Sequence, residues 1–396
     1  MKLRLLFVSV LLLVMGVMSV HAQAAKPIYV YIDGDTNISD WWTNTVKPGF
    51  EKANPQYEIV VTIVRGVGGG NSDIANRALA AMATGSDPQV DFFEQIGTSD
   101  QKAWQDQKLF LPITKDNVPN IATVIDATKR LPDEIPYRGS QVLLAYNSDN
   151  VKESEVPKTY ADLIQWIKDH PGQFVYNRPD KGGSGNAMVT RAIFEVTGKD
   201  PSLFKAGESD KTLIDRFPKA WDLLSSIHHD IYEDGSYPAG NTPVLELLAN
   251  GSVSMITAWS DQALAAIAQG TLPDTTKLAQ LTDLPFTGGY AFAAIPANST
   301  NKEGALALAN YLLTPDIQQH VVNDLGGFPA ISWSALPAEL QTKYTDVITS
   351  VVPTWPGGAY GAAEVQGWYD NVATNIQRDP TATPAPPATP EATAAS

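Results

Sequence analysis

The sequence predicts an α/β fold built on two sheets, and three observations support this expectation. Short runs of β-branched and aromatic residues alternate with helix-like segments from the start of the chain. The chain has 396 residues, of which 43 % are hydrophobic, enough for more than one hydrophobic core. Charged residues make up 18 %, which is too few for an intrinsically disordered chain. At this length, two sheets are more natural than one.

The first part of the chain is predicted to form a parallel sheet with helices on both faces. Its segments follow the order βαβα, which is typical of such a sheet. Ser39 can cap the first helix, and Gly85 can end the second. The expected segments are strands at 28–32, 57–64 and 90–93, a helix from Ser39 through Trp41 and Trp42 towards Phe50, and a helix at 72–84.

The alternation of strands and helices continues through the rest of the chain. Ligands of open α/β sheets bind beyond the carboxyl ends of strands, so the loops that follow strands hold the candidate site. Those loops carry aromatic, amide, hydroxyl and carboxylate side chains, which suit reversible recognition of a polar small molecule. The further expected segments are strands at 141–146, 174–176, 253–258 and 290–295, and helices at 160–168, 187–196 and 305–313, the last stopped by Pro315.

Both ends of the chain are predicted to lie outside the fold. Lys2 and Arg4 precede an apolar stretch at 5–20, and Ala22 and Ala24 then form an A-x-A pattern, so residues 1–24 are expected to be a secretory signal peptide. An uncleaved anchor is the rival interpretation, but the stretch is shorter than the roughly 20 apolar residues of a spanning helix. No cysteine follows for lipid attachment. Residues 379–396, almost entirely Pro, Ala and Thr, are expected to form a disordered tail.

Composition excludes several functional classes. The chain contains no cysteine, which removes disulfide scaffolds, cysteine-ligated zinc, iron–sulfur clusters and cysteine nucleophiles. The formal net charge of −15 argues against nucleic acid and against anionic lipid surfaces. His228 and His229 are adjacent and diverge on a helix, and no H-E-x-x-H motif occurs, so no metal site is predicted. No cofactor is expected either.

Two glycine-rich segments come close to known motifs without matching them. The loop at 66–71 resembles a dinucleotide fingerprint, but Asn71 stands in place of the third glycine. The segment around Ser184 lacks the last glycine of a nucleophile elbow, and Ser184 or Asn186 is predicted to cap the following helix. Asp33 and Asp35 flank a glycine in a turn, which is common for conformational reasons alone. The sequence therefore does not predict an enzyme.

Several stretches, in order along nearly the whole chain, resemble the extracellular solute-binding proteins of ABC importers, within the type II periplasmic-binding-protein superfamily. These stretches are I-Y-V-Y-I-D-G-D, V-D-F-F-E-Q-I-G, P-Y-R-G-S-Q-V-L-L-A-Y-N-S-D-N-V, L-A-N-G-S-V-S-M-I-T-A-W-S-D-Q-A and A-A-I-P-A-N-S-T-N-K-E-G-A-L-A-L-A-N-Y-L-L-T-P-D-I-Q. The stretch H-P-G-Q-F-V-Y-N-R-P-D-K-G-G-S-G-N-A further resembles the YnjB-type branch, which usually carries a tryptophan where this chain has Glu94.

The resemblance implies a two-lobed periplasmic-binding-protein fold, in which each lobe is a mixed sheet flanked by helices and a hinge joins the lobes. Lobe 1 would comprise residues 25–143 with about 292–333, and lobe 2 residues 147–288 with about 334–378. The protein would be a soluble periplasmic or extracellular monomer, without a lipid anchor, that delivers its solute to an ABC permease. The ligand-binding residues expected from the resemblance are Asp33, Asp35, Glu94, Gln95, Ser184, Gly185, Asn186, Trp259 and Tyr290. Asn177 is added from the loop after a predicted strand, and Trp42 because the adjacent Trp41 and Trp42 face different directions, so that one can lie in the core and the other in the cleft.

The chemistry of these residues favours a cationic amine or a thiamine-like ligand, because carboxylates lie near aromatic side chains. Arg178 could instead hold a carboxylate or phosphate at the following helix N-terminus, and the nine tryptophans leave sugars open. Two other functions stay open. One is a secreted hydrolase that uses a carboxylate pair such as Asp33 with Glu94, and the other is a ligand-binding sensor that docks onto a receptor.

Overall fold

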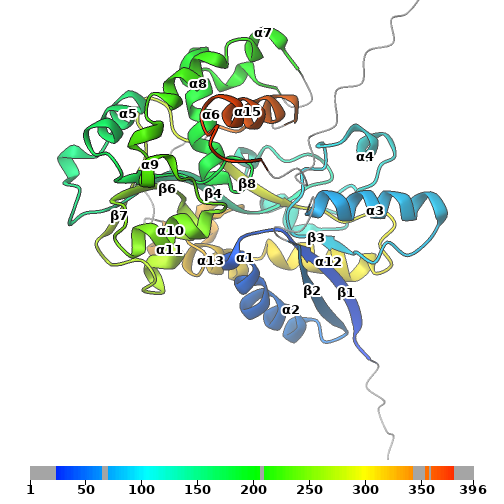
Figure 1. The fold of residues 1–396 in the computed structure, drawn as a ribbon. Coiled ribbons are helices and arrows are strands. Elements are labelled where there is room, and N and C mark those ends of the chain that lie inside the picture. The colour runs from blue at the N-terminus through cyan, green and yellow to red at the C-terminus, as the bar shows by residue number, and fades with distance from the viewer. Residues whose placement is uncertain (1–23, 65–69, 206–208, 342–352, 356–357, 379–396) are drawn as a thin grey trace, which may run out of the picture.

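The computed structural model describes residues 24–64, 70–205, 209–341, 353–355 and 358–378 (Figure 1). The predicted signal peptide, apart from residue 24, and the predicted tail lie outside these residues, as does most of the glycine-rich loop at 66–71. The strands are β1 Lys26–Ile32, β2 Tyr57–Ile63, β3 Phe92–Phe93, β4 Ile135–Asn147, β5 Phe174–Val175, β6 Met255–Trp259, β7 Thr276–Ala279, β8 Gly288–Ala293 and β9 Phe328–Pro329.

Helices cover both sheets. They are α1 Thr36–Trp41, α2 Lys47–Ala53, α3 Asn71–Thr84, α4 Lys102–Asp106, α5 Tyr160–Asp169, α6 Gly183–Thr197, α7 Lys211–Ile214, α8 Pro218–Ser225, α9 Tyr232–Gly235, α10 Asn241–Ala249, α11 Ser260–Ala268, α12 Lys302–Leu312, α13 Pro315–Asn323, α14 Ala338–Gln341 and α15 Gly358–Asn371. A π-helical turn at Trp42–Val46 joins α1 to α2, and short 3₁₀ turns lie at Pro119–Thr123, Asp126–Thr128, Glu153–Glu155, Pro201–Leu203, His228–Asp230 and Trp333–Ala335.

The first sheet is parallel, as predicted, with the strand order β2-β1-β3. Alternate residues of β1, namely Ile28, Val30 and Ile32, are fully buried and face the core, as a strand's period of two requires. Helix α3 ends at Gly85, whose φ of +66° places it in the left-handed region that glycine adopts without strain. The predicted strand and helix boundaries in this part are therefore close to those observed.

The second sheet differs from the parallel arrangement that the βαβα pattern predicts. Its order is β5-β6-β4-β7, and β4 is antiparallel to β6, β7, β8 and β9, whereas β5 and β6 are parallel. This sheet is mixed, as the resemblance implies, because the strands that flank β4 return from later parts of the chain. The local order of segments carries no information about that direction of return.

Strand β4 belongs to both halves of the molecule. Its first part, Ile135 to Gln141, pairs with β8, and its second part, from Val142 on, pairs with β6 and β7. Ile135 and Tyr137 lie in one hydrophobic cluster with β1, α1 and α12, whereas Val142 and Leu144 lie in another with α5, α6 and α8. Figure 1 shows β4 between the two groups of helices. One continuous buried strand thus links two separate cores.

Two predicted helix starts were wrong. Helix α1 begins at Thr36 with Asp35 at the N-cap position, so Ser39 lies inside the helix and does not cap it. Helix α6 begins at Gly183, and neither Ser184 nor Asn186 occupies the cap position. Instead, distant asparagine side chains accept hydrogen bonds from the first turn of α6, at Ser184 and Gly185. These partners are separated from the helix start in sequence, and local capping rules do not identify them.

Helix α15, drawn in orange-red in Figure 1, packs against α6 and α8 and buries a carboxyl group there. Glu364 is fully buried, and its Oε1 accepts a hydrogen bond from Thr190 Oγ1 at 2.9 Å. Burial raises the pKa of Glu364 to about 8, because the charged form loses its hydration. The folded protein therefore favours the neutral form of this side chain.

We predict that Glu364 makes the free energy of unfolding depend on pH. Because its pKa is higher in the folded chain than the ordinary value of 4.5, the folded state binds the proton more tightly, and stability falls as the pH rises from about 4.5 to about 8. Glu364→Gln should remove this part of the pH dependence and gain stability relative to the wild type above pH 8. Urea unfolding across this range measures the effect, with the exposed Glu58→Gln as control. An unchanged pH profile in Glu364→Gln would contradict it.

Candidate functional site

A cavity of about 1280 Å³ opens between the two halves of the molecule. Part of its lining comes from the loops that follow β1, β3 and β5, the location predicted for the ligand site of an α/β protein, and the rest comes from strands β4, β6 and β8 and from helix starts. The lining residues are Asp33, Gly34, Asp35, Asn37, Ile38, Gly70, Gln95, Arg138, Ser140, Arg178, Asp180, Lys181, Gly182, Gly183, Ala239, Gly240, Asn241, Thr242, Pro243, Trp259, Asp261, Gln262, Gly288, Gly289, Tyr290 and Ala291.

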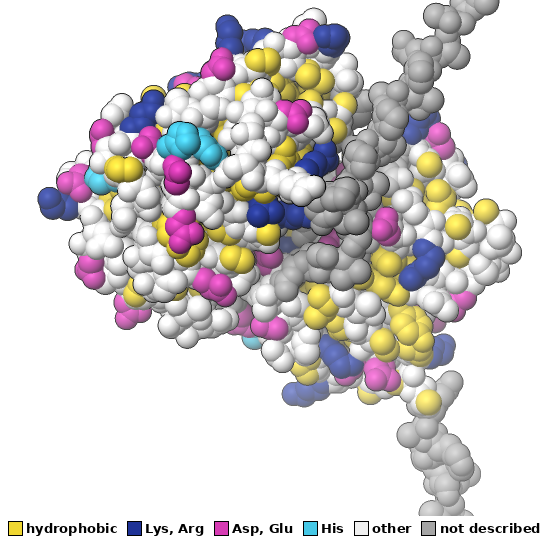
Figure 2. All heavy atoms as spheres, in the orientation of Figure 1, with side chains coloured by type: hydrophobic (Ala, Val, Ile, Leu, Met, Phe, Trp, Pro, Cys, Tyr) yellow, Lys and Arg dark blue, Asp and Glu magenta, His cyan; other side chains and the backbone are white. Residues whose placement is uncertain are grey.

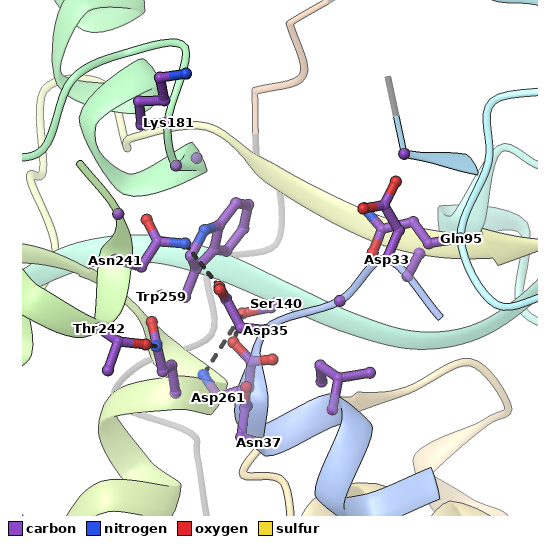
Figure 3. A pocket seen from close by; sticks show the side chains of 18 of the residues that line it. Asp33, Asp35, Asn37, Gln95, Ser140, Lys181, Asn241, Thr242, Trp259 and Asp261 are labelled. Atoms are coloured by element: carbon purple, nitrogen blue, oxygen red, sulfur yellow. Dashed lines mark hydrogen bonds between the residues drawn. The ribbon is translucent and has the colours of Figure 1, made fainter. Parts of the chain in front are cut away.

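The loop after β1 brings two carboxylates to the cavity. Asp33 Oδ2 accepts a hydrogen bond from the backbone N–H of Asn71 at 2.9 Å. Asp35 Oδ2 accepts one from Asn241 Nδ2 at 2.7 Å, and this bond joins the first half of the molecule to α10 in the second. Figure 3 shows Asp35 and Asn241 facing each other across the cavity, with Asp33 and Gln95 further along the same wall as Asp35. The structure thus brings three of the predicted residues, Asp33, Asp35 and Gln95, to one wall.

Glu94 does not line the cavity, although the resemblance placed it among the ligand residues. It is fully buried beneath the loop, where Oε2 accepts hydrogen bonds from the backbone N–H groups of Gly34 at 3.2 Å and Asp33 at 3.4 Å. Its Oε1 accepts hydrogen bonds from Tyr137 and Arg138. Glu94 therefore positions the loop that carries Asp33, and it does not form a solvent-facing carboxylate pair with that residue.

A buried arginine forms the floor of the cavity. Arg138 Nη2 lies 3.4 Å from Glu94 and Nη1 lies 3.5 Å from Asp261 at the start of α11. Burial alone would lower the pKa of Arg138, but the interactions with Tyr137, Glu94 and Asp261 outweigh it and raise the pKa. Asp261 also accepts a hydrogen bond from Ser140 Oγ at 2.6 Å. The guanidinium thus stays charged and ties β3, β4 and α11 together.

The predicted residues around the start of α6 form a scaffold under the cavity. Asn177 Oδ1 accepts hydrogen bonds from Ser184 Oγ at 2.6 Å and from the Gly185 N–H at 2.8 Å. Asn241 Oδ1 accepts from the N–H of Ser184 at 3.2 Å and from its Oγ at 3.0 Å. A Cβ atom at Gly185 would lie 1.8 Å from the backbone oxygen of Asn177, so only glycine fits there. Asn186 is half-buried and interacts with Glu364 of α15.

Two aromatic side chains line the cavity as expected from the resemblance. Trp259 ends β6 and is half-buried, and a Cβ atom at Gly183 would lie 2.6 Å from its Cζ2 atom. The glycine therefore lets α6 approach the indole closely. Tyr290 lies on β8, and burial raises its pKa to about 12. Both rings present apolar surface beside the polar groups, as in small-molecule sites.

Trp42 lies away from the cavity, contrary to its inclusion among the expected ligand residues. It is fully buried and packs against Phe92 and Tyr137, with ring centroids 5.9 Å and 6.0 Å away. Its neighbour Trp41 is also buried and stacks on Tyr137 at 6.2 Å. Both indoles face the core because this helical segment is covered on two sides, and both lie in one hydrophobic cluster with Phe92 and Tyr137. Adjacent aromatic residues on a helix therefore need not point one inwards and one outwards.

Several residues that line the cavity were not predicted from the sequence. Asn37 and Gln262 line the cavity, and neither the Asn37 amide nor Gln262 Oε1 has a hydrogen-bond partner among the described residues. Arg138 is the one charged residue of the strand-like run 135–147, which is a signal for a functional or paired charge. Asn241 begins α10 after a connection from α9, so the rule that points to loops after strands does not identify it.

The described residues contain no helix long and apolar enough to cross a membrane. Within the same residues, no three His, Asp or Glu side chains gather as ligands of a metal ion would. Acidic and basic side chains are scattered over the molecular face drawn in Figure 2, rather than gathered in one patch.

The chain is similar to several known proteins. Protein YnjB of Escherichia coli K12 is 27 % identical over 47 % of this chain and 47 % of its own length. The spermidine/putrescine-binding periplasmic protein of the same organism is 27 % identical over 59 % of this chain and 62 % of its own. The alignments thus span about half to three fifths of these relatives. The apo ferric ion-binding protein A of Pasteurella haemolytica has the same fold, with a TM-score of 0.65 at 13 % identity over 87 % of this chain and 98 % of that one.

The two-lobed periplasmic-binding-protein fold expected from the sequence is confirmed by this structural likeness. Residues 48–346 match the family described as bacterial extracellular solute-binding protein. This match covers most of the chain, including β4, the loop that carries Arg178 and Lys181, and Trp259, and it begins after the loop that carries Asp33 and Asp35. The chain therefore belongs to the family of bacterial extracellular solute-binding proteins.

Proposed function

We propose that this chain is the solute-capturing component of an ABC importer, which holds a small polar solute between two lobes and delivers it to a membrane permease. The observation that carries this proposal is the cavity of about 1280 Å³, whose walls come from both halves of the molecule. A ligand that touches both walls stabilises the closed arrangement, and a permease can then distinguish loaded from empty protein. The family and the names of the relatives support the same function.

The lobes of this proposal are those expected from the sequence, residues 25–143 with about 292–333, and 147–288 with about 334–378. The hydrophobic clusters support the division, because one joins β1, α1 and α12 and the other joins α5, α6, α8 and α15. We place the working protein outside the cytoplasm, as a periplasmic or extracellular monomer, in keeping with its extracellular family.

The proposed ligand carries a cationic group. Asp33 and Asp35 supply carboxylates on one wall, and Trp259 and Tyr290 supply aromatic surface beside the cavity. An ammonium group gains from both, through charge-assisted hydrogen bonds and cation–π contact. Polyamines and thiamine-like molecules meet this requirement, and one relative is named for binding spermidine and putrescine.

A thermal-shift screen of ligand-stripped protein tests the function directly. The probes are putrescine, spermidine, thiamine, maltose, amino acids and inorganic anions, each with a check for chemical turnover. A ligand at about 100 times its dissociation constant should raise the unfolding midpoint by roughly 3 °C. A shift without product formation supports a binding protein. Release of a product, or no shift with any probe, would contradict the proposal.

Trp259→Ala should weaken binding of the probe that gives the largest shift by about tenfold, because the indole forms an aromatic wall of the cavity. Trp259→Phe keeps an aromatic face and should recover part of this loss. Isothermal titration calorimetry measures both affinities, and the unfolding midpoint without ligand shows whether each variant folds. Equal affinities in the wild type and Trp259→Ala would place the ligand elsewhere.

Asn241→Asp should weaken binding of the ligand because it hinders closure of the cleft. The substitution keeps the oxygen that accepts from Ser184 but replaces the Nδ2 donor, 2.7 Å from Asp35, with a second carboxylate oxygen. The two like charges should repel and separate the walls, with a loss of affinity of about tenfold or more. The matched control is Asn250→Asp, at the exposed C-terminal end of the same helix. If the two variants bind equally well, contact between the walls does not govern affinity.

A further inference from the structure

The walls of the cavity carry opposite charges. Asp33 and Asp35 line it from the loop after β1, whereas Arg178, Asp180 and Lys181 line it from the loop that follows β5, where Lys181 Nζ lies 3.9 Å from Asp180 Oδ2. Figure 3 shows Lys181 beside the start of α6, on the far side of the cavity from Asp33 and Gln95. The loop after β5 therefore keeps a net positive charge, which lies opposite the two carboxylates of the loop after β1.

The floor does not supply the positive charge of this site. Arg138 lies between Glu94 at 3.4 Å and Asp261 at 3.5 Å, so its charge is balanced by carboxylates of the protein. The backbone N–H groups at the start of α6 are also not open to an anion, because those of Ser184 and Gly185 already donate hydrogen bonds to Asn241 and Asn177. An anionic group must therefore be recognised by the side chains of the basic wall.

The hydrogen bonds of Arg178 orient its side chain for recognition of an anionic group. Its Nε donates to the backbone oxygen of Tyr237 at 3.0 Å, and its own backbone N–H donates to Pro238 at 3.0 Å. Among the described residues, the Arg178 side chain makes no other hydrogen bond, which leaves its two Nη groups without a protein acceptor there. The Nε bond fixes the plane of the guanidinium, and its Nη donors can pair with both oxygens of a carboxylate or phosphate.

We propose that the ligand carries both an amine and an oxyanion, with the amine on Asp33 and Asp35 and the oxyanion on Arg178 and Lys181. This inference rests on the proposed function, since it names the substrate class of the same cleft. A diamine would bring its second positive charge to the basic wall, and a dicarboxylate would bring a negative charge to the acidic wall. A ligand with one charge of each sign satisfies both walls and joins the two lobes.

Matched sets of probes test this charge requirement. Isothermal titration calorimetry on ligand-stripped protein compares diamines, ω-amino carboxylates and dicarboxylates with two to six carbons in the chain. At one chain length or more, the ω-amino carboxylate should bind at least about tenfold tighter than the diamine and the dicarboxylate of equal length. An ω-aminoalkyl phosphate of the same length then distinguishes a carboxylate from a phosphate as the preferred oxyanion.

The variant Arg178→Gln assigns the preference to one side chain. It should reduce the tenfold preference for the amino carboxylate over the diamine to about twofold or less. Lys219→Gln, at an exposed position of α8, is the charge-matched control and should keep the preference. Lys181→Gln serves as a second variant, with a smaller loss, if the unfolding midpoint shows that Arg178→Gln is not folded.

The outcomes separate this inference from the proposed function. Tightest binding by a diamine, a dicarboxylate or an uncharged sugar would overturn the charge requirement but leave solute binding in place. A preference for the amino carboxylate that survives both Arg178→Gln and Lys181→Gln would also overturn it. Failure of all of these probes, and of those in the thermal-shift screen, would contradict the proposed function as well.

Discussion

The cleft of this protein depends on one buried guanidinium. Arg138 lies on β4, the strand that links the two hydrophobic cores, and its Nη groups reach Glu94 at the end of β3 and Asp261 at the start of α11. A buried charge is costly unless opposite charges and hydrogen bonds surround it, and removal of one partner leaves the others unpaired. The positions of β3 and α11 relative to β4 are therefore tightly constrained. Both elements lead directly into the lining of the cavity.

This constraint separates the floor of the cavity from its walls. The floor is continuous with β4 and is held by buried ionic groups, whereas the walls are loops that meet through the hydrogen bond between Asp35 and Asn241. Asn241 also supports the first turn of α6 through Ser184, so the contact between the walls and the shape of the basic loop are linked through one amide. A ligand between the walls would therefore affect both the Asp35–Asn241 contact and the shape of the basic loop. Such an arrangement suits a protein whose two lobes close on a solute about a common strand.

Sequence reasoning succeeds here where the determining contacts are local. Strand β1, helix α5 and the end of α3 at Gly85 follow from residue type and spacing, and so do the placement of Asp33 and Asp35 in a loop after a strand and of Trp259 at the end of one. It fails where a contact with a residue far away in the sequence determines whether a side chain lines the cavity. Glu94 follows a strand like the ligand residues do, but Arg138 and the backbone of Gly34 hold it inside.

The start of α6 and the direction of the second sheet show the same limit. Ser184 has the chemistry of a cap, yet Asn177 and Asn241 occupy that role, and Asn241 lies 57 residues away along the chain. Strand β4 pairs with strands that return much later, so its antiparallel partners are invisible in the local order of segments. In each case the missing information is a contact between residues far apart in sequence. The resemblance to a family supplies part of it, but not the orientation of individual side chains.

The central claim is that a solute binds between the lobes and closes them about β4, and a distance measurement across the cleft tests it most directly. The chain has no cysteine, so two spin labels can be attached specifically at Ala80→Cys on α3 and Lys219→Cys on α8, both exposed. Double electron–electron resonance is recorded on ligand-stripped protein with and without saturating putrescine, thiamine or 4-aminobutanoate. The account predicts that a probe which binds by calorimetry shifts the distance distribution and narrows it. An unchanged distribution in the presence of a bound probe would contradict closure of the lobes on the ligand.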